Sequence, residues 1–421
     1  MSLPTALTKT NPRNIATGPW MVVFLLCIVG ALNYLDRTMI TTMRSSIVSD
    51  MPMSDTQFGL LTSAFLWIYG VLSPFAGWLA DRFSRSRVII CSLLVWSLVT
   101  FLTSYARTFE QLLATRIFMG ISEACYIPAA LALISDYHSN KTRSLATGIH
   151  IAGIYVGGSL GFVGGLISEN HHWGYAFHVF GLIGIVYGLI LFFVLKDAPA
   201  RQQLKQEDLA GLSFRMAAKN LFTSRLYIRM LFFWGLMGIV GWMVMGWLPT
   251  YYKEHFQLSQ SLAGLYATGY LYPASIAGLI FGGFIADRWS RRNDGARILV
   301  PMIGLFVASP CIFLASDTTI LPLAIFFFVV YAFTYVFTDA NLMPILCFVT
   351  DQRYRATGYG ILNMFATIIG GLGIFAGGYL RDANVNLSFV FKSAAIILMI
   401  CAVILYGIYL LNKKRILNSK V

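Results

Sequence analysis

The stretch Gly77-Trp-Leu-Ala-Asp81-Arg82-Phe-Ser-Arg85 recurs 206 residues later as Gly283-Phe-Ile-Ala-Asp287-Arg288-Trp-Ser-Arg291. A second pair of segments is related in the same way. Glu123 and Pro128 are five residues apart, and Asp339 and Pro344 repeat that spacing at an offset of 216 residues. Two independent echoes at similar offsets predict a duplicated chain with two related halves.

The composition predicts a membrane protein. The chain is 57% hydrophobic and 12% charged, with a mean hydropathy of +0.69, whereas soluble domains are about 25% charged. Twelve apolar runs are about twenty residues or longer, which is enough to span a bilayer as helices. We therefore expect an all-α polytopic protein with two pseudo-symmetric six-helix halves and spans near 20–43, 56–80, 88–106, 109–135, 145–168, 174–195, 227–252, 261–286, 297–315, 319–349, 357–380 and 388–411.

The basic residues predict the topology. With the N-terminus in the cytoplasm, the inner segments hold 24 of the 31 Lys and Arg residues and the outer loops hold five, a clear positive-inside bias. Both termini should be cytoplasmic. This topology accounts for the net charge of +13 and requires no nucleic acid as partner. The predicted parts are an inner tail (1–19), the first half (20–196), a cytoplasmic linker (197–226), the second half (227–411) and a second tail (412–421).

The linker and the cysteines have more than one interpretation. Apolar residues interspersed with bases at 196–229 are compatible with an amphipathic helix on the inner leaflet or with a disordered tether. The first apolar run is too long for a cleavable signal peptide. All six cysteines lie within apolar runs without metal-ligand spacing, which is typical of small core residues.

Four charged residues lie inside apolar runs: Asp36, Arg37, Arg116 and Glu123. A charge at the centre of a membrane helix costs about 2.5–3.5 kcal/mol on insertion scales. Such residues usually face a protein interior or an aqueous cavity, where they handle ions or substrate. A purely structural buried ion pair is the alternative.

The spacing of Arg116 and Glu123 suggests a mechanism. They are seven residues apart, which places them two turns or about 10.5 Å apart on one helix face. The arginine fork can bind a carboxylate with two hydrogen bonds. Burial favours the protonated form of an acid, and a nearby arginine opposes it. We therefore expect protonation of Glu123, with Asp36 as a second candidate, to free an arginine for a substrate anion.

The repeated Gly-x-x-Ala-Asp-Arg-x-x-Arg loops resemble the signature of the major facilitator superfamily, and the resemblance covers nearly the whole chain. It implies a twelve-helix fold that rocks about a central cavity. The loop charges would then influence the balance between inward-open and outward-open states; the alternative is that the arginines only fix the topology. The predicted gating residues are Asp81, Arg82, Arg85, Asp287 and Arg288.

Finer motifs resemble the anion:cation symporter branch of that superfamily. They are Asn33-Tyr34-x-Asp36-Arg37, Gly120-x-x-Glu123-x-x-x-x-Pro128-Ala129, Trp247-Leu-Pro249 and Asn363. This resemblance implies that Arg37 contacts the substrate anion, that Asp36 and Glu123 carry protons, and that Asn363 contacts the substrate. The first motif, with the seven-residue spacing of Arg116 and Glu123, also resembles the Spinster-like branch, whose members are linked to lipid-derived substrates.

Several other residues are candidates. Asp339 departs from the anion-symporter pattern, and it could be an extra proton site, a contact for a cationic substrate group, or the mark of another subfamily. Tyr69 and Tyr155 could offer hydroxyl groups to a substrate. His150 could be a gating residue or a satisfied structural histidine.

The leading hypothesis is proton-coupled symport of a small organic anion, such as a sugar acid, by a monomer in a bacterial inner membrane. The alternative is export or transport of lipids or amphipaths by proton antiport. A transporter-like sensor or a membrane enzyme is a third class, although no nucleophile elbow, phosphate loop or metal cluster is found in the sequence. No cofactor is expected besides the coupling ion, for which H⁺ is favoured over Na⁺. The predicted partners are the small anionic substrate and membrane lipid.

Overall fold

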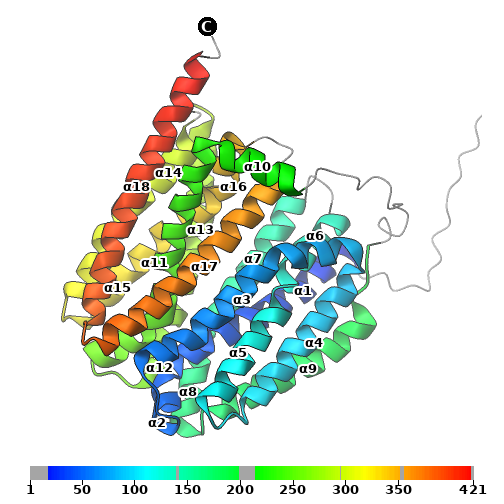
Figure 1. The fold of residues 1–421 in the computed structure, drawn as a ribbon, viewed down its shortest axis with the longest axis vertical. Coiled ribbons are helices and arrows are strands. Elements are labelled where there is room, and N and C mark those ends of the chain that lie inside the picture. The colour runs from blue at the N-terminus through cyan, green and yellow to red at the C-terminus, as the bar shows by residue number, and fades with distance from the viewer. Residues whose placement is uncertain (1–17, 139–141, 199–213, 294, 351–354, 419–421) are drawn as a thin grey trace, which may run out of the picture.

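The computed structural model describes residues 18–138, 142–198, 214–293, 295–350 and 355–418. Within these ranges the regular structure is helical, and twelve segments are long and apolar enough to cross a membrane. The predicted fold class and number of spans are therefore confirmed. Figure 1 shows the two groups of helices as two bodies, with α3 and α17 side by side at their boundary.

The first body, the N-half, contains six spans, of which two are interrupted. The short helix α2 follows the first span. The N-half helices are α1 (Pro19–Thr42), α2 (Arg44–Asp50), α3 (Asp55–Arg82), α4 (Arg85–Thr103), α5 (Phe109–Glu123), α6 (Tyr126–Tyr137), α7 (Arg143–Ser159), α8 (Phe162–Asn170) and α9 (Gly174–Val194).

The second body, the C-half, also contains six spans. The helix α10 (Phe214–Thr223) precedes it and is the described part of the predicted linker; residues 199–213 lie outside the described ranges. The C-half helices are α11 (Arg225–His255), α12 (Gln260–Gly264), the π-helix η3 (Leu265–Tyr270), α13 (Leu271–Ser290), α14 (Ala296–Asp317), α15 (Leu321–Tyr335), α16 (Phe337–Val349), α17 (Arg355–Asp382) and α18 (Leu387–Asn418).

Polar side chains cap the N-termini of several spans. The Ser54 hydroxyl oxygen accepts a hydrogen bond from the backbone N–H of Gln57, and the backbone N–H of Ser54 donates one to Gln57 Oε1. Such a capping box satisfies two N–H groups that the first turn leaves free. Thr108 and Ser224 cap α5 and α11 in a related manner.

The interruptions in two spans lie beside acidic residues. In the fourth span α5 ends at Glu123 and α6 begins at Tyr126. In the tenth, α15 and α16 meet at Val336, three residues before Asp339. A proline follows each acid by five residues, and a proline within a helix removes one backbone hydrogen bond. The acids therefore lie where their helices are irregular.

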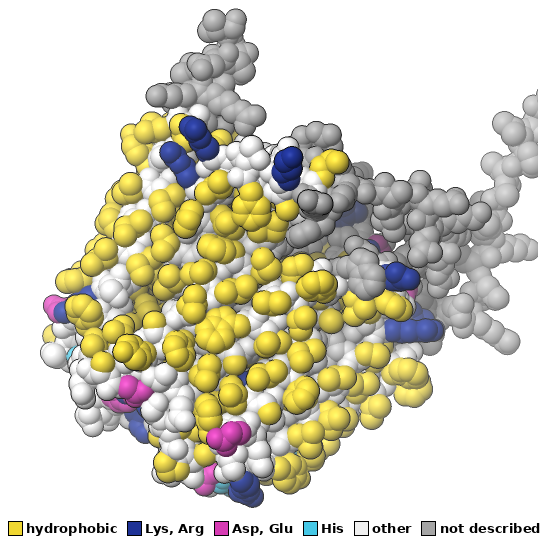
Figure 2. Space-filling view, viewed as in Figure 1, with side chains coloured by type: hydrophobic (Ala, Val, Ile, Leu, Met, Phe, Trp, Pro, Cys, Tyr) yellow, Lys and Arg dark blue, Asp and Glu magenta, His cyan; other side chains and the backbone are white. Residues whose placement is uncertain are grey.

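The outer surface suits a lipid environment. Hydrophobic side chains cover most of the face in Figure 2, and charged side chains gather towards its two ends. Phe193 and Ile280, for example, are 76% and 70% exposed. Exposed apolar side chains of this size are stable in a bilayer and would be unfavourable in water.

The two halves contact each other mainly towards one end. We call this end, which includes the α1–α3 and α17–α18 connections, the outer end, following the predicted topology. α3 and α17 pack together from Asp55 and Asp382 to Gly70 and Met364. Among the described residues, hydrogen bonds between the halves lie from this end to the middle of the spans. This arrangement corresponds to a closed outer side.

Candidate functional site

Arg37 and Glu123 form a buried ion pair in the N-half. Arg37 Nε donates a hydrogen bond to Glu123 Oε2 at 2.8 Å, and their side chains are 2% and 0% exposed. Asn33 Nδ2 donates to the same oxygen, also at 2.8 Å. Asn33 and Arg37 are four residues apart on α1, so both side chains reach α5 from one helix face. Glu123 is thus held by two donors from α1.

Arg116 and Asp36 lie beside this pair. Asp36 Oδ2 accepts a hydrogen bond from Thr100 of α4 at 3.1 Å. Arg116 is 2% exposed, and its charge interacts with those of Asp36 and Glu123. Asp36, Arg37, Arg116 and Glu123, the four charges of the first and fourth spans, therefore form one cluster. The sequence did not predict that Glu123 binds the arginine on α1 rather than the one on its own helix.

Both arginines have unused hydrogen-bond donors. Arg116 Nε and Nη2 and Arg37 Nη2 are buried and have no acceptor among the described atoms. A buried donor without a partner costs about 1–3 kcal/mol, and more when it is charged. Such groups in a native fold call for an explanation, and a missing anion is one.

A pocket joins these arginines to the C-half. Two of its lining residues come from α11 and the others from α1, α3 and α5. In this state the pocket is narrow, with about 10 Å³ open to the centre of a water molecule, so it must widen to admit a substrate. It is lined by Arg37, Ile40, Thr62, Phe65, Leu66, Arg116, Trp242 and Met245. Since both halves contribute, a bound molecule would contact the two bodies at once.

Aromatic rings surround the Arg37 guanidinium group. Its central carbon lies 4.5 Å from the ring centroid of Tyr69 and 4.9 Å from those of Tyr34 and Phe65. Aromatic faces attract cations and fix their orientation. Tyr69 is therefore next to the arginine, where the sequence predicted a substrate contact.

Tyr155 and Asp339 meet across the boundary between the halves. The Tyr155 hydroxyl group on α7 lies 3.5 Å from Asp339 Oδ2 on α16. Asp339 is partly buried. Tyr155 thus lies next to Asp339, the acid of the tenth span.

Asn363 and His150 have different environments. Asn363 is partly buried on α17, and its described hydrogen bond is through its backbone oxygen, with Thr367. His150 is fully buried inside the N-half, where its ring centroid lies 5.9 Å from that of Tyr126 and its Cε1 faces Gly30. The described contacts of His150 therefore do not include the boundary between the halves.

The repeated loops make contacts within each half. Arg85 binds Asp136 Oδ1 at 2.5 Å and the backbone oxygen of Ala132 at 2.7 Å, so it links the start of α4 to α6. In the C-half, Asp287 Oδ1 binds Arg297 at 3.1 Å. Arg82 and Arg288 are exposed. The side chain of Asp81 lies outside the described residues.

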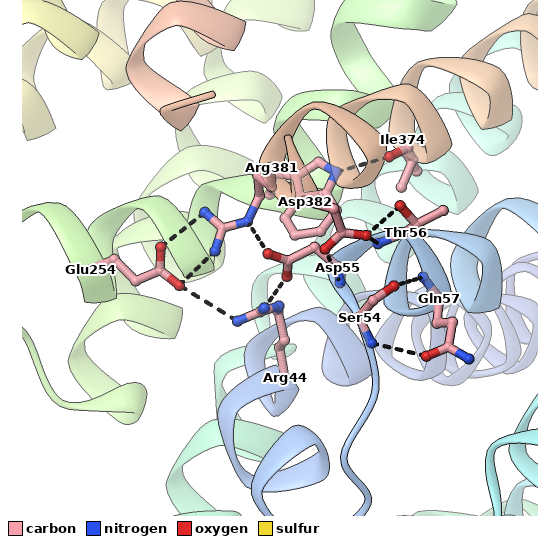
Figure 3. Close-up of polar contacts among 10 residues, drawn as sticks. Arg44, Ser54, Asp55, Thr56, Gln57, Glu254, Ile374, Arg381 and Asp382 are labelled. Carbon is pink, nitrogen blue, oxygen red and sulfur yellow. Dashed lines mark hydrogen bonds and ion pairs between the residues drawn. The ribbon is translucent and has the colours of Figure 1, made fainter. Parts of the chain in front are cut away.

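A charged network, which we call the outer network, connects the halves at the outer end (Figure 3). Arg381 donates to Asp55 through Nε and to both oxygens of Glu254 through its two terminal nitrogens, each at 2.9 Å. Arg44 also binds Asp55 and Glu254. The charges therefore alternate in sign, and each arginine contacts an acid of the opposite half.

The first turn of α3 adds to this network. Asp382 accepts hydrogen bonds from the backbone N–H groups of Asp55 and Thr56, both at 2.9 Å. A carboxylate is favoured at this position because the free N–H groups and the helix dipole both attract negative charge. The N-terminus of α3 is thus capped by a residue of the C-half.

The outer network was not predicted from the sequence. Arg44 and Arg381 are two of the five basic residues that the predicted topology places in the outer loops. The signal that could have found the network is the presence of opposite charges at the outer ends of the first, second, seventh and eleventh spans. Asn33 was noted as part of a motif, but its bond to Glu123 was not predicted.

Comparisons with known proteins agree with the fold. The family model described as Major Facilitator Superfamily matches residues 26–374. In three dimensions, a solved inward-facing and unoccupied bacterial homolog of the human lysosomal transporter Spinster has a TM-score of 0.75 and 23% identity, and the match covers 95% of this chain and 98% of that one.

Relatives in sequence belong to two groups. Protein spinster of Drosophila melanogaster is 25% identical, covering 73% of this chain and 52% of its own, so this chain spans about half the length of that relative. A "Probable sulfoacetate transporter" of Cupriavidus necator is 27% identical, covering 89% of this chain and 90% of its own. A "Probable galactarate/D-glucarate transporter" of Escherichia coli is 24% identical, with coverage of 92% and 94%.

The family match covers more than half of the chain, and the arrangement of twelve spans agrees with it. The protein is therefore an integral membrane protein that belongs to the major facilitator superfamily.

Proposed function

We propose that the protein is a proton-coupled symporter of a small organic anion, such as a sugar acid, and that it works by rocker-switch alternating access. The observation that carries this proposal is the set of buried, unpaired donors on Arg37 and Arg116 beside a pocket lined by both halves. An anion in that pocket would accept charge-assisted hydrogen bonds from both guanidinium groups.

Glu123 and the substrate compete for Arg37. While Glu123 is ionised, it occupies Arg37 Nε. Protonation removes its charge and weakens that bond, so the guanidinium group becomes available for an anion. Proton binding and anion binding then favour each other, which is the condition for symport. Asp36 is the second candidate proton carrier, because it shares the electrostatic environment of Arg116 and Glu123.

The bonds between the halves at the outer end suggest how alternating access works. The outer network keeps the outer side closed, so a substrate would leave towards the inside in this state. Opening the outer side requires these cross-half bonds to break. The loop residues Asp81, Arg82, Arg85, Asp287 and Arg288 and the buried His150 are proposed to bias the same equilibrium from within the halves.

The relatives support a small acid as substrate. The names of two of them refer to sulfoacetate and to galactarate or glucarate, which are small organic anions. Tyr69 beside Arg37, Tyr155 beside Asp339 and the partly buried Asn363 are the proposed polar contacts for the rest of the substrate. We place the protein in a bacterial inner membrane as a monomer, with both termini in the cytoplasm.

A second candidate function is transport of a lipid-derived or other amphipathic compound by proton antiport. The similarity to Protein spinster favours it, as does the motif Asn33-Tyr34-x-Asp36-Arg37. In this case the arginines would bind an acidic head group.

Uptake into proteoliposomes tests the proposal. Radiolabelled hexuronates, aldonates, dicarboxylates and neutral sugars are offered under an inward proton gradient, with a sodium gradient and a protonophore as controls. We expect one acid class to accumulate in the wild type and not in Arg37→Ala, while Arg107→Ala, an exposed outer arginine, behaves as wild type. Failure to take up any acid, together with binding of an amphipath, would favour the second function.

A further inference from the structure

Asp339 differs from the other intramembrane acids in its surroundings. Asp36 and Glu123 interact with arginines. The described neighbours of Asp339 include the Tyr155 hydroxyl group, 3.5 Å away, and no basic side chain. An acid in a membrane protein is costly unless it is paired or reaches an aqueous space. Asp339 is partly exposed, and its contact with Tyr155 of α7 places its carboxyl group at the boundary between the halves.

Tyrosines from several helices lie in the electrostatic neighbourhood of this carboxyl group. Besides Tyr155, four lie close enough to interact electrostatically with it, and they come from α1, α15 and α17: Tyr34, Tyr331, Tyr335 and Tyr359. The Tyr335 hydroxyl group donates to the backbone oxygen of Met237 at 2.7 Å, and its ring centroid lies 5.4 Å from that of Tyr331. The rings of Tyr331 and Tyr335 are therefore held by contacts other than Asp339.

Two glycines make room for tyrosines at this place. A Cβ atom on Gly158 would lie 2.7 Å from the ring of Tyr272, which packs against Tyr155 with its centroid 5.7 Å away. A Cβ atom on Gly241 would lie 2.6 Å from the Tyr335 hydroxyl oxygen. The aromatic surroundings of Asp339 thus depend on specific close packing from both halves.

Tyr34 interacts with both Asp339 and the arginine cluster. Its ring centroid lies 4.9 Å from the Arg37 guanidinium carbon, and its hydroxyl group interacts electrostatically with Asp339. One side of the central region therefore presents a cation from the N-half, and the other presents an acid from the C-half, with tyrosines between them.

We propose that Asp339 and the surrounding tyrosines form a subsite for a cationic group, so that the transported molecule is a small carboxylate or sulfonate that also carries an ammonium group. This inference rests on the proposed function, because the anionic end is assigned to Arg37 and Arg116. The ammonium group donates to the Asp339 carboxylate and lies against tyrosine rings, which attract cations.

The charges explain why an ammonium group fits better than a hydroxyl group. A sugar hydroxyl can donate to the carboxylate, but it leaves the negative charge of Asp339 uncompensated in a medium of low dielectric constant. An ammonium group provides both the hydrogen bond and the opposite charge. A molecule with both charges also bridges the two halves, so it connects the bodies that move relative to each other.

Matched pairs of acids that differ only in a hydroxyl or an amino group test this subsite. The pairs are gluconate with 2-amino-2-deoxygluconate, glycerate with serine, and isethionate with taurine. Affinities are measured by ligand-induced thermal shift of the purified protein and by competition in proteoliposome uptake. For at least one pair, we expect the wild type to bind the amino member about tenfold more tightly or better.

Variants of Asp339 and Arg37 distinguish the cationic subsite from the proposed anion transport. Asp339→Asn should lose the preference for the amino member and keep binding of the hydroxyl member, whereas Asp339→Glu should retain part of the preference. Arg37→Ala should lose both members. Equal binding of both members by the wild type, or an equal loss of both in Asp339→Asn, would overturn the cationic subsite alone. Failure of the wild type to bind any acid would overturn the proposed function together with it.

Discussion

Arg381 Nε donates to Asp55 Oδ2 at 2.9 Å, which ties the last turn of α17 to the first turn of α3. The two side chains are only 14% and 15% exposed, so water screens this pair weakly. Because Asp55 belongs to the N-half and Arg381 to the C-half, the bond exists only while the outer ends of these helices are together.

Replacing Arg381 with Gln should shift the protein towards an outward-open state. The change removes bonds to both Asp55 and Glu254. Hydrogen bonds to charged groups contribute about 1.5–3 kcal/mol, which corresponds to roughly 10–150-fold in the ratio of the two states. The measurement is the distance between spin labels at the outer ends of the two halves. Lys392→Gln is the control, since Lys392 binds Asp317 within the C-half. Unchanged distances in Arg381→Gln would argue against the gating role.

Replacing Glu123 with Gln should uncouple transport from protons. Glutamine has a similar shape and cannot carry the charge that holds Arg37, so the variant resembles the protonated state. We expect anion affinity that is independent of pH, whereas wild-type affinity should rise as the pH falls. Net uptake driven by a proton gradient should be lost, and exchange of internal for external substrate should persist. Glu110→Gln, at the exposed start of the same helix, is the control. A wild-type response to pH in Glu123→Gln would exclude Glu123 as the proton carrier.

Replacing Arg116 with Lys should weaken anion binding although the charge is kept. The planar guanidinium group presents several donors in a fixed arrangement, and lysine provides a single charged centre on a flexible chain. Loss of the donors that face the pocket should raise the dissociation constant about tenfold. Isothermal titration of the purified variant measures this. Arg107→Lys, exposed near the start of α5, should bind as the wild type does; equal affinities for all three proteins would place Arg116 outside the binding site.

Replacing Gly157 with Ala should destabilise the N-half. A Cβ atom there would lie 2.0 Å from the backbone oxygen of Ala31, so α7 and α1 would have to move apart. Forced overpacking of this type costs about 1–3 kcal/mol. Gly148 lies on the same helix, and a Cβ atom would meet nothing within 4 Å. Gly148→Ala should therefore leave the midpoint of thermal unfolding in detergent unchanged or raise it slightly. Similar midpoints for the two variants would contradict this packing.

Much of the fold could be predicted from the sequence because the membrane restricts it. A backbone in lipid must satisfy its own hydrogen bonds, so long apolar runs are almost certain to be helices. The repeated segment around Asp81 and Asp287 predicted that the chain is divided into two related halves. The interruptions at Glu123 and Val336 were not predicted, since hydropathy depends on composition and contains no information on backbone geometry.

The candidate site was predicted only as a set of residues. A charge inside an apolar run identifies Arg37 and Glu123 as important, but it does not specify which charges pair. That depends on how α1 and α5 are rotated against each other. The outer network was missed for a related reason. Asp55, Glu254 and Arg381 lie near the ends of spans, where charges are common, and only their three-dimensional arrangement distinguishes them.

The helix interruptions beside Glu123 and near Asp339 also have a consequence for hydration. A continuous membrane helix exchanges its amide hydrogens from its ends, because its centre has no free backbone groups. In the fourth and tenth spans the hydrogen-bond ladder is broken within the membrane, where a carbonyl group freed by Pro128 or Pro344 would attract water. Deuterium should therefore enter these two spans from the middle as well, and the same water would give protons a route to the acids.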